Sequence, residues 1–217
     1  MTPDALDREG FAAFMLRLRG KGLTDKTVLS AFEATPRRGF VPNQWQDHAW
    51  SDRMLPIPCG EALEGVDIQA TVISALDLTS SVRVLEIGTG TGYTAAVMGR
   101  LSGRILSLDR YKALVQQARA RLEALGIGNV LLRQADGAHG VAAEGPFDRI
   151  ISWASFDELP RGFVDQLSSG GVMIAPIGPP DEPQMLVRLT KTGSRFEEQE
   201  VGLVRLQPIA HGMAEAL

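Results

Sequence analysis

The sequence predicts an α/β fold of the Rossmann-like type: a doubly wound, mostly parallel sheet of seven strands, preceded by extra helices. Three observations predict it. From residue 82 onwards, apolar runs of strand length alternate with helical patterns, the connections between them are short, and a glycine-rich turn follows the first run. The 217 residues suffice for one domain with a substantial core and are few for two. We therefore expect a single domain over residues 1–217, with residues 81–217 as its α/β core and residues 1–80 as helices and a long loop.

The first third of the chain is predicted to be helical. Thr2 can cap a helix whose first residue is Pro3, because the N–H that proline lacks is not needed there. Gly20 ends this helix, Thr24 can cap a second one, and Pro36 ends the second. These signals predict two helices before the core.

Residues 36–58 show no regular period and are rich in proline, tryptophan and charge. A long aperiodic stretch inside a compact domain is often a functional loop. We therefore interpret this stretch as the start of a loop for substrate. A helix from Val66 to Leu78 is predicted to follow it and to lead into the core.

The core is predicted from ranges that alternate between strand and helix patterns. Five strands are expected at Val82–Ile87, Arg104–Leu108, Asn129–Arg133, Phe147–Trp153 and Val172–Ile177. Helices are expected at Tyr93–Leu101 and Lys112–Leu125, and a further helix opens at Pro160. The last two strands, Met185–Thr190 and Glu198–Leu206, flank a turn at Gly193-Ser194 and are predicted to form an antiparallel hairpin at the edge of the sheet.

Composition argues against several classes of protein. A net charge of −4 and a pI near 5.4 argue against charge-driven binding to nucleic acid. The single cysteine, Cys59, allows no intramolecular disulfide, and the three histidines lack metal-ligand spacing, so no metal is expected. The N-terminus lacks the features of a signal peptide, and no apolar run approaches the roughly 20 residues that span a bilayer. We therefore expect a cytoplasmic protein without a membrane partner.

A glycine-rich turn joins the first core strand to the next helix. It reads Glu86-Ile87-Gly88-Thr89-Gly90-Thr91-Gly92-Tyr93. Glycines let the backbone turn sharply and come close to a ligand, and the free N–H groups of the helix start favour an anionic group. We therefore assign cofactor contacts to residues of this turn, which are Glu86, Gly88, Thr89, Gly90, Gly92 and Tyr93.

Two acidic residues follow the next two strands. Asp109 ends the second strand about 20 residues after the glycines, where a carboxylate can bind ribose hydroxyls. Asp136 follows the third strand, near where an adenine amino group would need an acceptor. Parallel strands bring their C-terminal ends to one edge of the sheet, where open α/β sheets bind ligands. We assign Asp109, Arg110, Asp136 and Gly137 to the same cofactor site, although either aspartate alone could equally be a helix cap.

The spacing of the glycines separates two classes of cofactor. Dinucleotide-binding enzymes use G-x-G-x-x-G, and in that register the third glycine would fall at position 93, which is Tyr93. The sequence instead gives G-x-G-x-G, with Glu86 two positions before the first glycine, and this form resembles the motif of class I methyltransferases. The resemblance implies S-adenosyl-L-methionine as the cofactor and S-adenosyl-L-homocysteine as the product.

Short segments along nearly the whole chain carry a more specific resemblance. They are Pro36-Arg37-Arg38-Gly39-Phe40-Val41-Pro42, Asp52-Arg53-Met54-Leu55-Pro56-Ile57, Gly92-Tyr93-Thr94-Ala95-Ala96-Val97, Asn129-Val130, Asp136-Gly137, Pro146-Phe147-Asp148-Arg149-Ile150, Gln166-Leu167, Gly170-Gly171 and Pro176-Ile177-Gly178. In this order they resemble the protein-L-isoaspartate O-methyltransferase family. Many short matches in the right order are more specific than any one of them.

The resemblance implies an activity and a partner. Members of the family transfer a methyl group to the abnormal α-carboxylate of an isoaspartyl residue, and the ester then collapses to a succinimide, so that the damaged bond can be restored. A protein or peptide is therefore the expected partner, and the oligomeric state is left open. A carboxylate is already a competent nucleophile, so such an enzyme mainly supplies alignment and a dry site. A non-catalytic S-adenosylmethionine-binding protein of the same fold is the alternative.

One segment departs from the pattern of the family. After the Leu-Pro-Ile at 55–57, family members usually carry Gly-x-Gly-Gln-Thr-Ile-Ser, whereas this chain has Pro58-Cys59-Gly60-Glu61-Ala62-Leu63-Glu64. The Gln, Thr and Ser positions are therefore Glu61, Ala62 and Glu64. An anion beside an anionic nucleophile is unfavourable unless one of the two is protonated or paired with a cation.

Three interpretations of Glu61 and Glu64 stay open, and we assign both as candidate catalytic residues. They could contact a different substrate, with Glu64 as the general base that a hydroxyl or an amine would need. The segment could instead have drifted in a protein with little catalysis, or both side chains could point to solvent. Arg37 and Arg38 could pair with either glutamate or with a substrate carboxylate, or lie on the surface. Trp153 is a candidate for the pocket wall.

Overall fold

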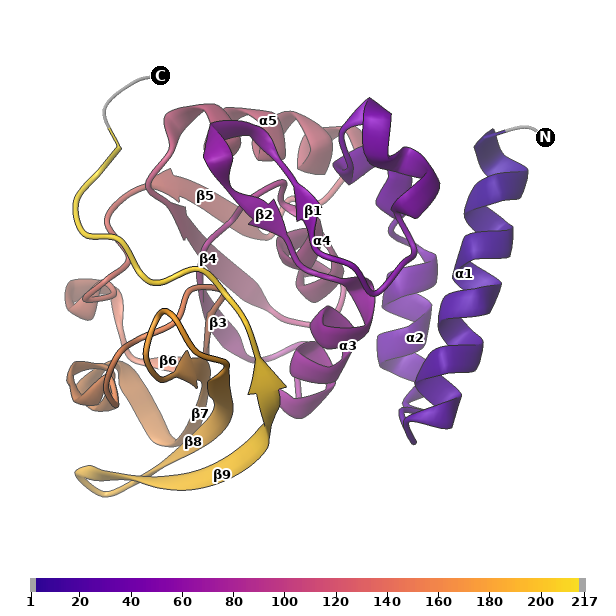
Figure 1. Cartoon of the computed structure of the whole chain (residues 1–217). Helices are drawn as coiled ribbons and strands as arrows, with labels where there is room; N and C mark the ends of the chain where they lie inside the picture. Colours follow the sequence, from indigo (N-terminus) through magenta and orange to yellow (C-terminus); the bar gives the residue numbers. More distant parts are fainter. Residues whose placement is uncertain (1–2, 215–217) are drawn as a thin grey trace.

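A seven-stranded sheet runs through the centre of the computed structural model, which describes residues 3–214 (Figure 1). Its strand order is β5-β4-β3-β6-β7-β8-β9, in which β3 to β7 pair in parallel and β8 and β9 pair antiparallel. The strands are β3 (Arg83–Ile87), β4 (Arg104–Asp109), β5 (Val130–Gln134), β6 (Phe147–Ser152), β7 (Leu167–Ile177), β8 (Gln184–Thr192) and β9 (Arg195–Val204). The prediction of a mostly parallel α/β sheet with an antiparallel C-terminal hairpin is confirmed.

The inner strands are apolar because side chains on both faces of the sheet are covered. Successive residues of a strand point to opposite faces, so Val84 belongs to one apolar cluster and Leu85 to the other. The first cluster includes side chains of α3 (Val66–Ala75), α4 (Tyr93–Gly99) and α5 (Lys112–Ala124). On the other face, the helix expected from Pro160 is a six-residue 3-10 helix, η5 (Arg161–Gln166).

Two helices precede the core, α1 (Pro3–Gly20) and α2 (Lys26–Glu33). The N-cap of the second helix lies one residue after Thr24, the cap that the sequence predicts. The N-cap is Asp25, whose carboxylate accepts hydrogen bonds from the backbone N–H groups of Thr27 (2.8 Å) and Val28 (3.3 Å). A carboxylate at the N-cap satisfies two donors that have no partner within the helix, which is why Asp25 rather than Thr24 caps α2. The predicted Thr2 cap lies outside the described residues.

An ion-pair cluster joins α1 to α3. Arg17 and Lys21 both bind the buried carboxylate of Asp67, each at 2.8 Å, and Arg17 also donates to the carbonyl oxygen of Trp50 at 2.6 Å. These charge-assisted bonds pull the pKa of Asp67 down, although burial alone would raise it. The cluster fixes α1 against α3 and against the segment around Trp50.

Residues 36–65 are more regular than their composition predicts. They contain the 3-10 helices η1 (Arg37–Phe40), η2 (Asn43–His48) and η3 (Pro58–Gly60), and a small antiparallel hairpin of β1 (Leu55–Pro56) with β2 (Ala62–Leu63). The hairpin packs closely against the glycine-rich turn. A Cβ on Gly90 would lie 3.5 Å from Cδ1 of Ile57, which directly follows β1. The loop expected to meet the substrate therefore forms one wall above the sheet.

Within residues 3–214, no helix combines the length and the apolar character that crossing a bilayer requires.

Gly92 is predicted to tolerate a side chain much less well than Gly126, although both have a positive φ. Its φ is +85°, and an added Cβ would lie 2.8 Å from Cβ of Ala118 on α5, whereas Gly126 has a φ of +67° with open space around it. We expect Gly126→Ala to lower the free energy of unfolding by about 1 kcal/mol and Gly92→Ala by about 3 kcal/mol. Urea unfolding of both variants measures the difference, and equal losses would show that α4 does not need this close approach to α5.

Candidate cofactor and acceptor site

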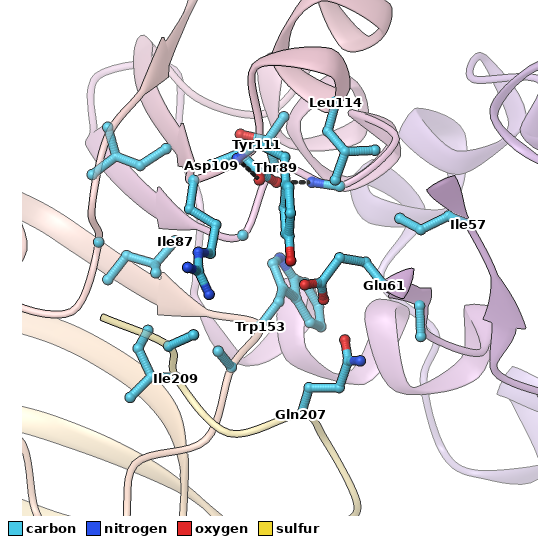
Figure 2. Close-up of a pocket in the computed structure, with 18 of the residues that line it drawn as sticks. Ile57, Glu61, Ile87, Thr89, Asp109, Tyr111, Leu114, Trp153, Gln207 and Ile209 are labelled. Carbon is cyan, nitrogen blue, oxygen red and sulfur yellow. Dashed lines mark hydrogen bonds between the residues drawn. The ribbon is translucent and has the colours of Figure 1, made fainter. Parts of the chain in front are cut away.

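A cavity lies at the C-terminal edge of the parallel strands, and its empty space of about 800 Å³ includes the open solvent at its mouth. It is lined by the glycine-rich turn, by residues that follow β4 and β5, by the hairpin β1–β2 and by a C-terminal segment. Figure 2 shows side chains of the hairpin, of the ends of β3 and β4 and of the C-terminal segment pointing toward one space. The predicted site residues that lie on its wall are Glu61, Glu64, Gly88, Thr89, Gly90, Asp109, Arg110 and Gly137.

The glycine-rich turn between β3 and α4 is held by backbone bonds. The N–H groups of Gly88 and Thr89 donate to the carbonyl oxygen of Leu108 at 2.8 and 3.1 Å. Gly88 and Gly90 have φ angles of +92° and +52°, which residues other than glycine rarely adopt. A Cβ on Gly88 would lie 3.2 Å from Cβ of Trp153, so glycine also keeps the turn close to this wall of the cavity. The turn therefore presents backbone, rather than side chains, to a ligand.

Glu86 lies beneath the turn and braces it. Its buried carboxylate accepts hydrogen bonds from Oγ1 of Thr94 (2.5 Å), Oγ of Ser107 (2.6 Å) and Nε1 of Trp153 (3.0 Å). Burial outweighs these donors and raises the pKa of Glu86 to about 7. Glu86 is not on the cavity wall, but it holds Thr94 and Trp153, which are. Trp153 thus occupies the wall position that the sequence suggested.

Asp109 ties the end of β4 to the turn. One carboxylate oxygen accepts the N–H of Gly90 at 2.8 Å, and the other accepts the N–H of Tyr111 at 2.9 Å (Figure 2). Burial raises the pKa of Asp109 to about 6. The next residue, Arg110, also lines the cavity, and its buried Nε finds no acceptor among the residues that the structure describes. A carboxylate and an unpaired donor therefore stand side by side at the cavity.

Asp136 and Gly137 follow β5 in different roles. Gly137 lines the cavity, and a Cβ there would lie 2.6 Å from Cγ2 of Ile87. The carboxylate of Asp136 accepts backbone N–H groups of Ala138 (2.8 Å) and Gly212 (2.7 Å). Although burial alone would raise the pKa of Asp136, these donors hold it below its usual value. Asp136 therefore binds backbone groups and is not on the cavity wall. Its hydrogen bonds position the segments around Ala138 and Gly212.

Tyr93 and Gly92 are assigned to the cofactor from the sequence, but the structure does not place them on the cavity wall. Tyr93 is fully buried, with its ring 6.0 Å from the ring of Phe32 and 5.3 Å from that of Phe40. The guanidinium of Arg37 lies over the same ring at 4.4 Å. As the first residue of α4, Tyr93 points away from the turn and into the core, and Gly92 packs against α5. Both residues therefore lie in the packing beneath the glycine-rich turn rather than on the cavity wall.

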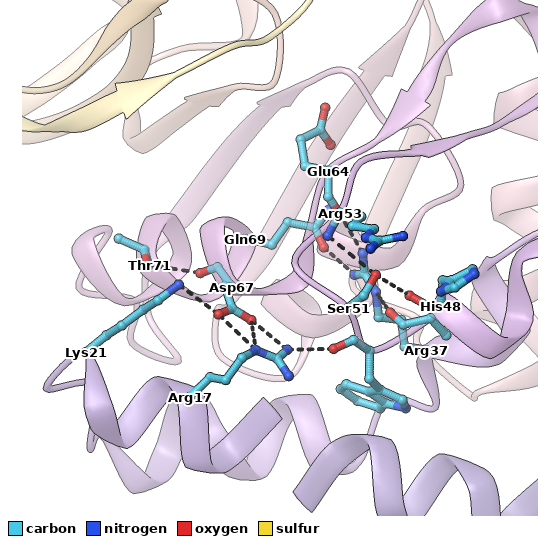
Figure 3. Close-up of polar contacts among 12 residues, drawn as sticks. Arg17, Lys21, Arg37, His48, Ser51, Arg53, Glu64, Asp67, Gln69 and Thr71 are labelled. Atoms are coloured by element: carbon cyan, nitrogen blue, oxygen red, sulfur yellow. Dashed lines mark hydrogen bonds and ion pairs between the residues drawn. The ribbon is translucent and has the colours of Figure 1, made fainter. Parts of the chain in front are cut away.

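Arg37 is fully buried and acts on the backbone of the hairpin segment. It donates to the carbonyl oxygens of Ala49 (2.5 Å) and Glu64 (2.6 Å) and to Oε1 of Gln69 (Figure 3). The suggested ion pairs with Glu61 or Glu64 are not formed within residues 3–214. Arg38 instead reaches the carbonyl oxygen of Gln46 at 3.0 Å and the carboxylate of Asp47 at 3.6 Å. Of the two arginines, Arg37 therefore positions the cavity wall.

Glu61 and Glu64 both lie on the cavity wall, which corrects the interpretation that they face only solvent. Burial raises the pKa of Glu61, while the Tyr111 hydroxyl and the Arg110 guanidinium partly offset it. Figure 2 shows Tyr111 and Glu61 pointing toward one another. Burial raises the pKa of Glu64 to about 7, and the Arg37 guanidinium offsets only part of that effect.

The C-terminal segment after β9 forms a wall that sequence reasoning missed. Gln207–Ala210 line the cavity, and Gln207 donates from Nε2 to the carbonyl oxygen of Gly60 at 3.3 Å. Backbone bonds of 2.8 Å join Ser155 to Gln207 and to Ile209. This segment has no strand or helix period that could have predicted its place.

In the part of the chain that the structure describes, no three His, Cys, Asp or Glu side chains gather as a metal site would require.

Comparisons with known proteins decide the family. The family model described as Protein-L-isoaspartate(D-aspartate) O-methyltransferase matches residues 10–214. Protein-L-isoaspartate O-methyltransferase of Rhizobium meliloti is 45% identical over 202 residues, covering 93% of this chain and 99% of the relative. The chain belongs to this family. The same-named protein of Azorhizobium caulinodans is 43% identical, with full coverage of both chains. The family resemblance predicted from the sequence is confirmed.

Solved structures agree on the fold of these methyltransferases. A structure named protein-L-isoaspartate O-methyltransferase aligns with a TM-score of 0.82 and 26% identity, covering 94% of this chain and 67% of that one. A candidate protein-L-isoaspartate O-methyltransferase from Plasmodium falciparum, in complex with S-adenosyl-L-homocysteine, aligns with a TM-score of 0.77 and 22% identity. It covers 91% of this chain and 97% of that one, and it supports the fold alone.

Asp109 is predicted to control cofactor affinity. Removing its carboxylate in Asp109→Ala deletes a partner of a bound ribose and frees the Gly90 N–H, at a cost of about 1.5–3 kcal/mol. We expect the dissociation constant of S-adenosyl-L-homocysteine, measured by calorimetry, to rise about 10- to 100-fold. Glu144→Gln, which alters an exposed ion pair with Arg133, serves as the control. Unchanged affinity in Asp109→Ala would remove Asp109 from the cofactor site.

Glu86 is predicted to make the cofactor-free protein less stable as the pH rises. Its pKa of about 7 in the folded state exceeds the unfolded value of 4.5, so the folded state holds more protons between these values. The stabilisation is complete below about pH 4.5 and is lost as the pH passes 7, by up to about 3 kcal/mol. We expect Glu86→Gln to flatten the fall in free energy of unfolding between pH 5 and 8. An unchanged slope would show that Glu86 keeps an ordinary pKa.

Proposed function

We propose that this chain transfers a methyl group from S-adenosyl-L-methionine to the α-carboxylate of isoaspartyl residues in proteins and peptides. The observation that carries the proposal is the combination of full-length similarity to protein-L-isoaspartate O-methyltransferases with a cavity at the C-terminal edge of the sheet. The cavity offers a cradle of glycines on one side and a separate wall from the hairpin β1–β2 on the other. A cytoplasmic location and a protein or peptide partner belong to the same proposal.

The residues present fit the cofactor. Gly88 and Gly90 give the close backbone approach that the methionine part needs, and a Cβ at Gly88 would fill this space beside Trp153. Asp109 offers its carboxylate to ribose hydroxyls, and the unpaired Nε of Arg110 offers a donor nearby. Gly137 lines the cavity where a Cβ would collide with Ile87, so a glycine there would leave space for the flat adenine ring. When bound, S-adenosyl-L-methionine supplies a methyl group on a positively charged sulfur.

The chain itself has little proton chemistry to perform. An oxygen of the acceptor carboxylate forms the new bond to the methyl carbon, and the electron pair of the breaking carbon–sulfur bond stays on sulfur. The negative acceptor and the positive sulfonium neutralise each other, so no proton is transferred. Ile57, Leu63, Leu114 and Trp153 give the cavity apolar walls, which exclude water and align the two reactants.

A second candidate function rests on the two carboxyl groups of the hairpin segment. Glu61 and Glu64 line the cavity without a neutralising ion pair in the described part of the chain. An ionised Glu64 would suit a hydroxyl or amine acceptor, from which it could take a proton as a general base. This candidate differs from the proposed function in the acceptor and keeps the same cofactor.

Methyl transfer to a defined peptide tests the proposed function. Labelled S-adenosyl-L-methionine is supplied with an isoaspartyl peptide, and the same peptide with a normal aspartyl residue is the matched control. We expect base-labile label on the isoaspartyl peptide alone, because a methyl ester hydrolyses in base whereas a methylated amine does not. Absence of label, with S-adenosyl-L-homocysteine binding demonstrated by calorimetry, would contradict the acceptor. Base-stable label on a protein pool would favour the second candidate.

A further inference from the structure

The cavity wall contains two polar side chains that are close to one another in sequence, Glu64 and Gln69. Glu64 follows β2, and Gln69 lies in the first turns of α3. The connection between them is tightly packed, because a Cβ on Gly65 would lie 2.2 Å from the carbonyl oxygen of Asp52. The two side chains are therefore placed by a backbone that has little freedom to shift.

The nearest buried cation does not neutralise Glu64. Arg37 donates to the main-chain oxygen of Glu64, to the carbonyl oxygen of Ala49 and to Oε1 of Gln69. In Figure 3 the carboxyl group of Glu64 points away from these contacts and carries no dashed line. Within residues 3–214, this carboxyl group makes no ion pair and no hydrogen bond with another residue. The guanidinium of Arg37 therefore positions the backbone of the cavity wall and does not neutralise the carboxyl group of Glu64.

The same contacts orient the amide of Gln69. Since Oε1 accepts from Arg37, the other end of the amide is the Nε2 donor group, and Gln69 lies on the cavity wall. An N–H donor is what a carboxylate ligand requires. The carboxyl group of Glu64 lines the same cavity, and in its neutral form it would provide a second donor.

The surroundings of Glu64 favour its neutral form. The charged groups that face it are Arg37 from η1, Glu61 from the loop before β2 and Glu86 from β3. Burial and the two glutamates oppose ionisation and together outweigh Arg37, which raises the pKa of Glu64 to about 7. A carboxylic acid kept neutral by its site can donate a hydrogen bond at physiological pH.

We propose that Glu64 binds the acceptor as a neutral acid and, with the amide nitrogen of Gln69, donates hydrogen bonds to the acceptor carboxylate. This inference rests on the proposed function and adds a specificity-determining pair to it. It removes the conflict of an anionic side chain beside an anionic nucleophile, because the proton stays on Glu64 throughout methyl transfer. The bonds that change are the carbon–oxygen bond that forms and the carbon–sulfur bond that breaks.

The inference has a consequence that can be measured without turnover. Above about pH 7, Glu64 of the free enzyme loses its proton, so binding of an anionic acceptor must take one proton up. The affinity for the acceptor then falls about tenfold for each pH unit above 7. A glutamine at position 64 donates from its amide at every pH, and the dependence should disappear.

The experiment measures binding of an isoaspartyl peptide to the protein saturated with S-adenosyl-L-homocysteine, by calorimetry from pH 6 to 9. The peptide has blocked ends and no other group that titrates in this range. For the wild-type protein we expect the tenfold loss per pH unit and, at pH 8, uptake of about one proton, read from buffers of different ionisation enthalpy. Glu64→Gln should bind within about fivefold of wild type at pH 7, with no pH dependence and no proton uptake.

Glu61→Gln is the matched control, since it removes a carboxyl group from the same wall. Whatever its affinity, Glu61→Gln should keep the pH dependence. Loss of peptide binding in Glu64→Gln at every pH, with S-adenosyl-L-homocysteine still bound, would overturn the inference and show that position 64 must carry an anion. Wild-type binding that does not change with pH would also overturn it. If the wild-type protein binds and methylates no isoaspartyl peptide, the proposed function itself fails, and the inference falls with it.

Discussion

The buried guanidinium of Arg37 is the interaction on which the arrangement of the site depends. It joins the end of η2, the end of β2 and the first turns of α3 through Ala49, Glu64 and Gln69. It also packs on the ring of Tyr93, which begins α4 directly after the glycine-rich turn. One side chain thereby fixes the N-terminal segment to the α/β core. A buried arginine with its donors satisfied is costly to disturb, because removing it leaves carbonyl groups unpaired.

The cavity has two halves with different origins. The α/β core supplies the glycine-rich turn, Asp109 and Gly137 from strand ends, where parallel sheets gather their binding residues. The N-terminal segment supplies Glu61 and Glu64, and the C-terminal segment closes the space between the halves. A binding site for a common cofactor can therefore stay constant while the hairpin determines which acceptor enters. The chemistry fits this division, since methyl transfer to a carboxylate needs alignment more than proton transfer.

Much of the fold and half of the site could be predicted from the sequence, because they depend on local patterns. Apolar runs predicted the strands, and the glycine spacing and Asp109 placed one half of the cavity. The other half depends on contacts between distant residues. The sequence around Arg37 is also typical of the protein surface, so its burial could not be predicted. Gln207–Ala210 show no helix or strand period, so their place on the cavity wall could not be predicted either. Tyr93 was assigned to the ligand from its place after the glycines, but the helix turns its ring into the core.

The most direct test of this account separates the two halves by changing the side chain that joins them. In Arg37→Lys, one ammonium group replaces a planar fork that serves three acceptors, so the hairpin wall should lose its position while the strand ends keep theirs. Calorimetry with S-adenosyl-L-homocysteine, and then with an isoaspartyl peptide added, measures each half in turn. The account predicts a cofactor affinity within about threefold of wild type and a loss of peptide affinity of about tenfold or more. Equal losses for both ligands would contradict it.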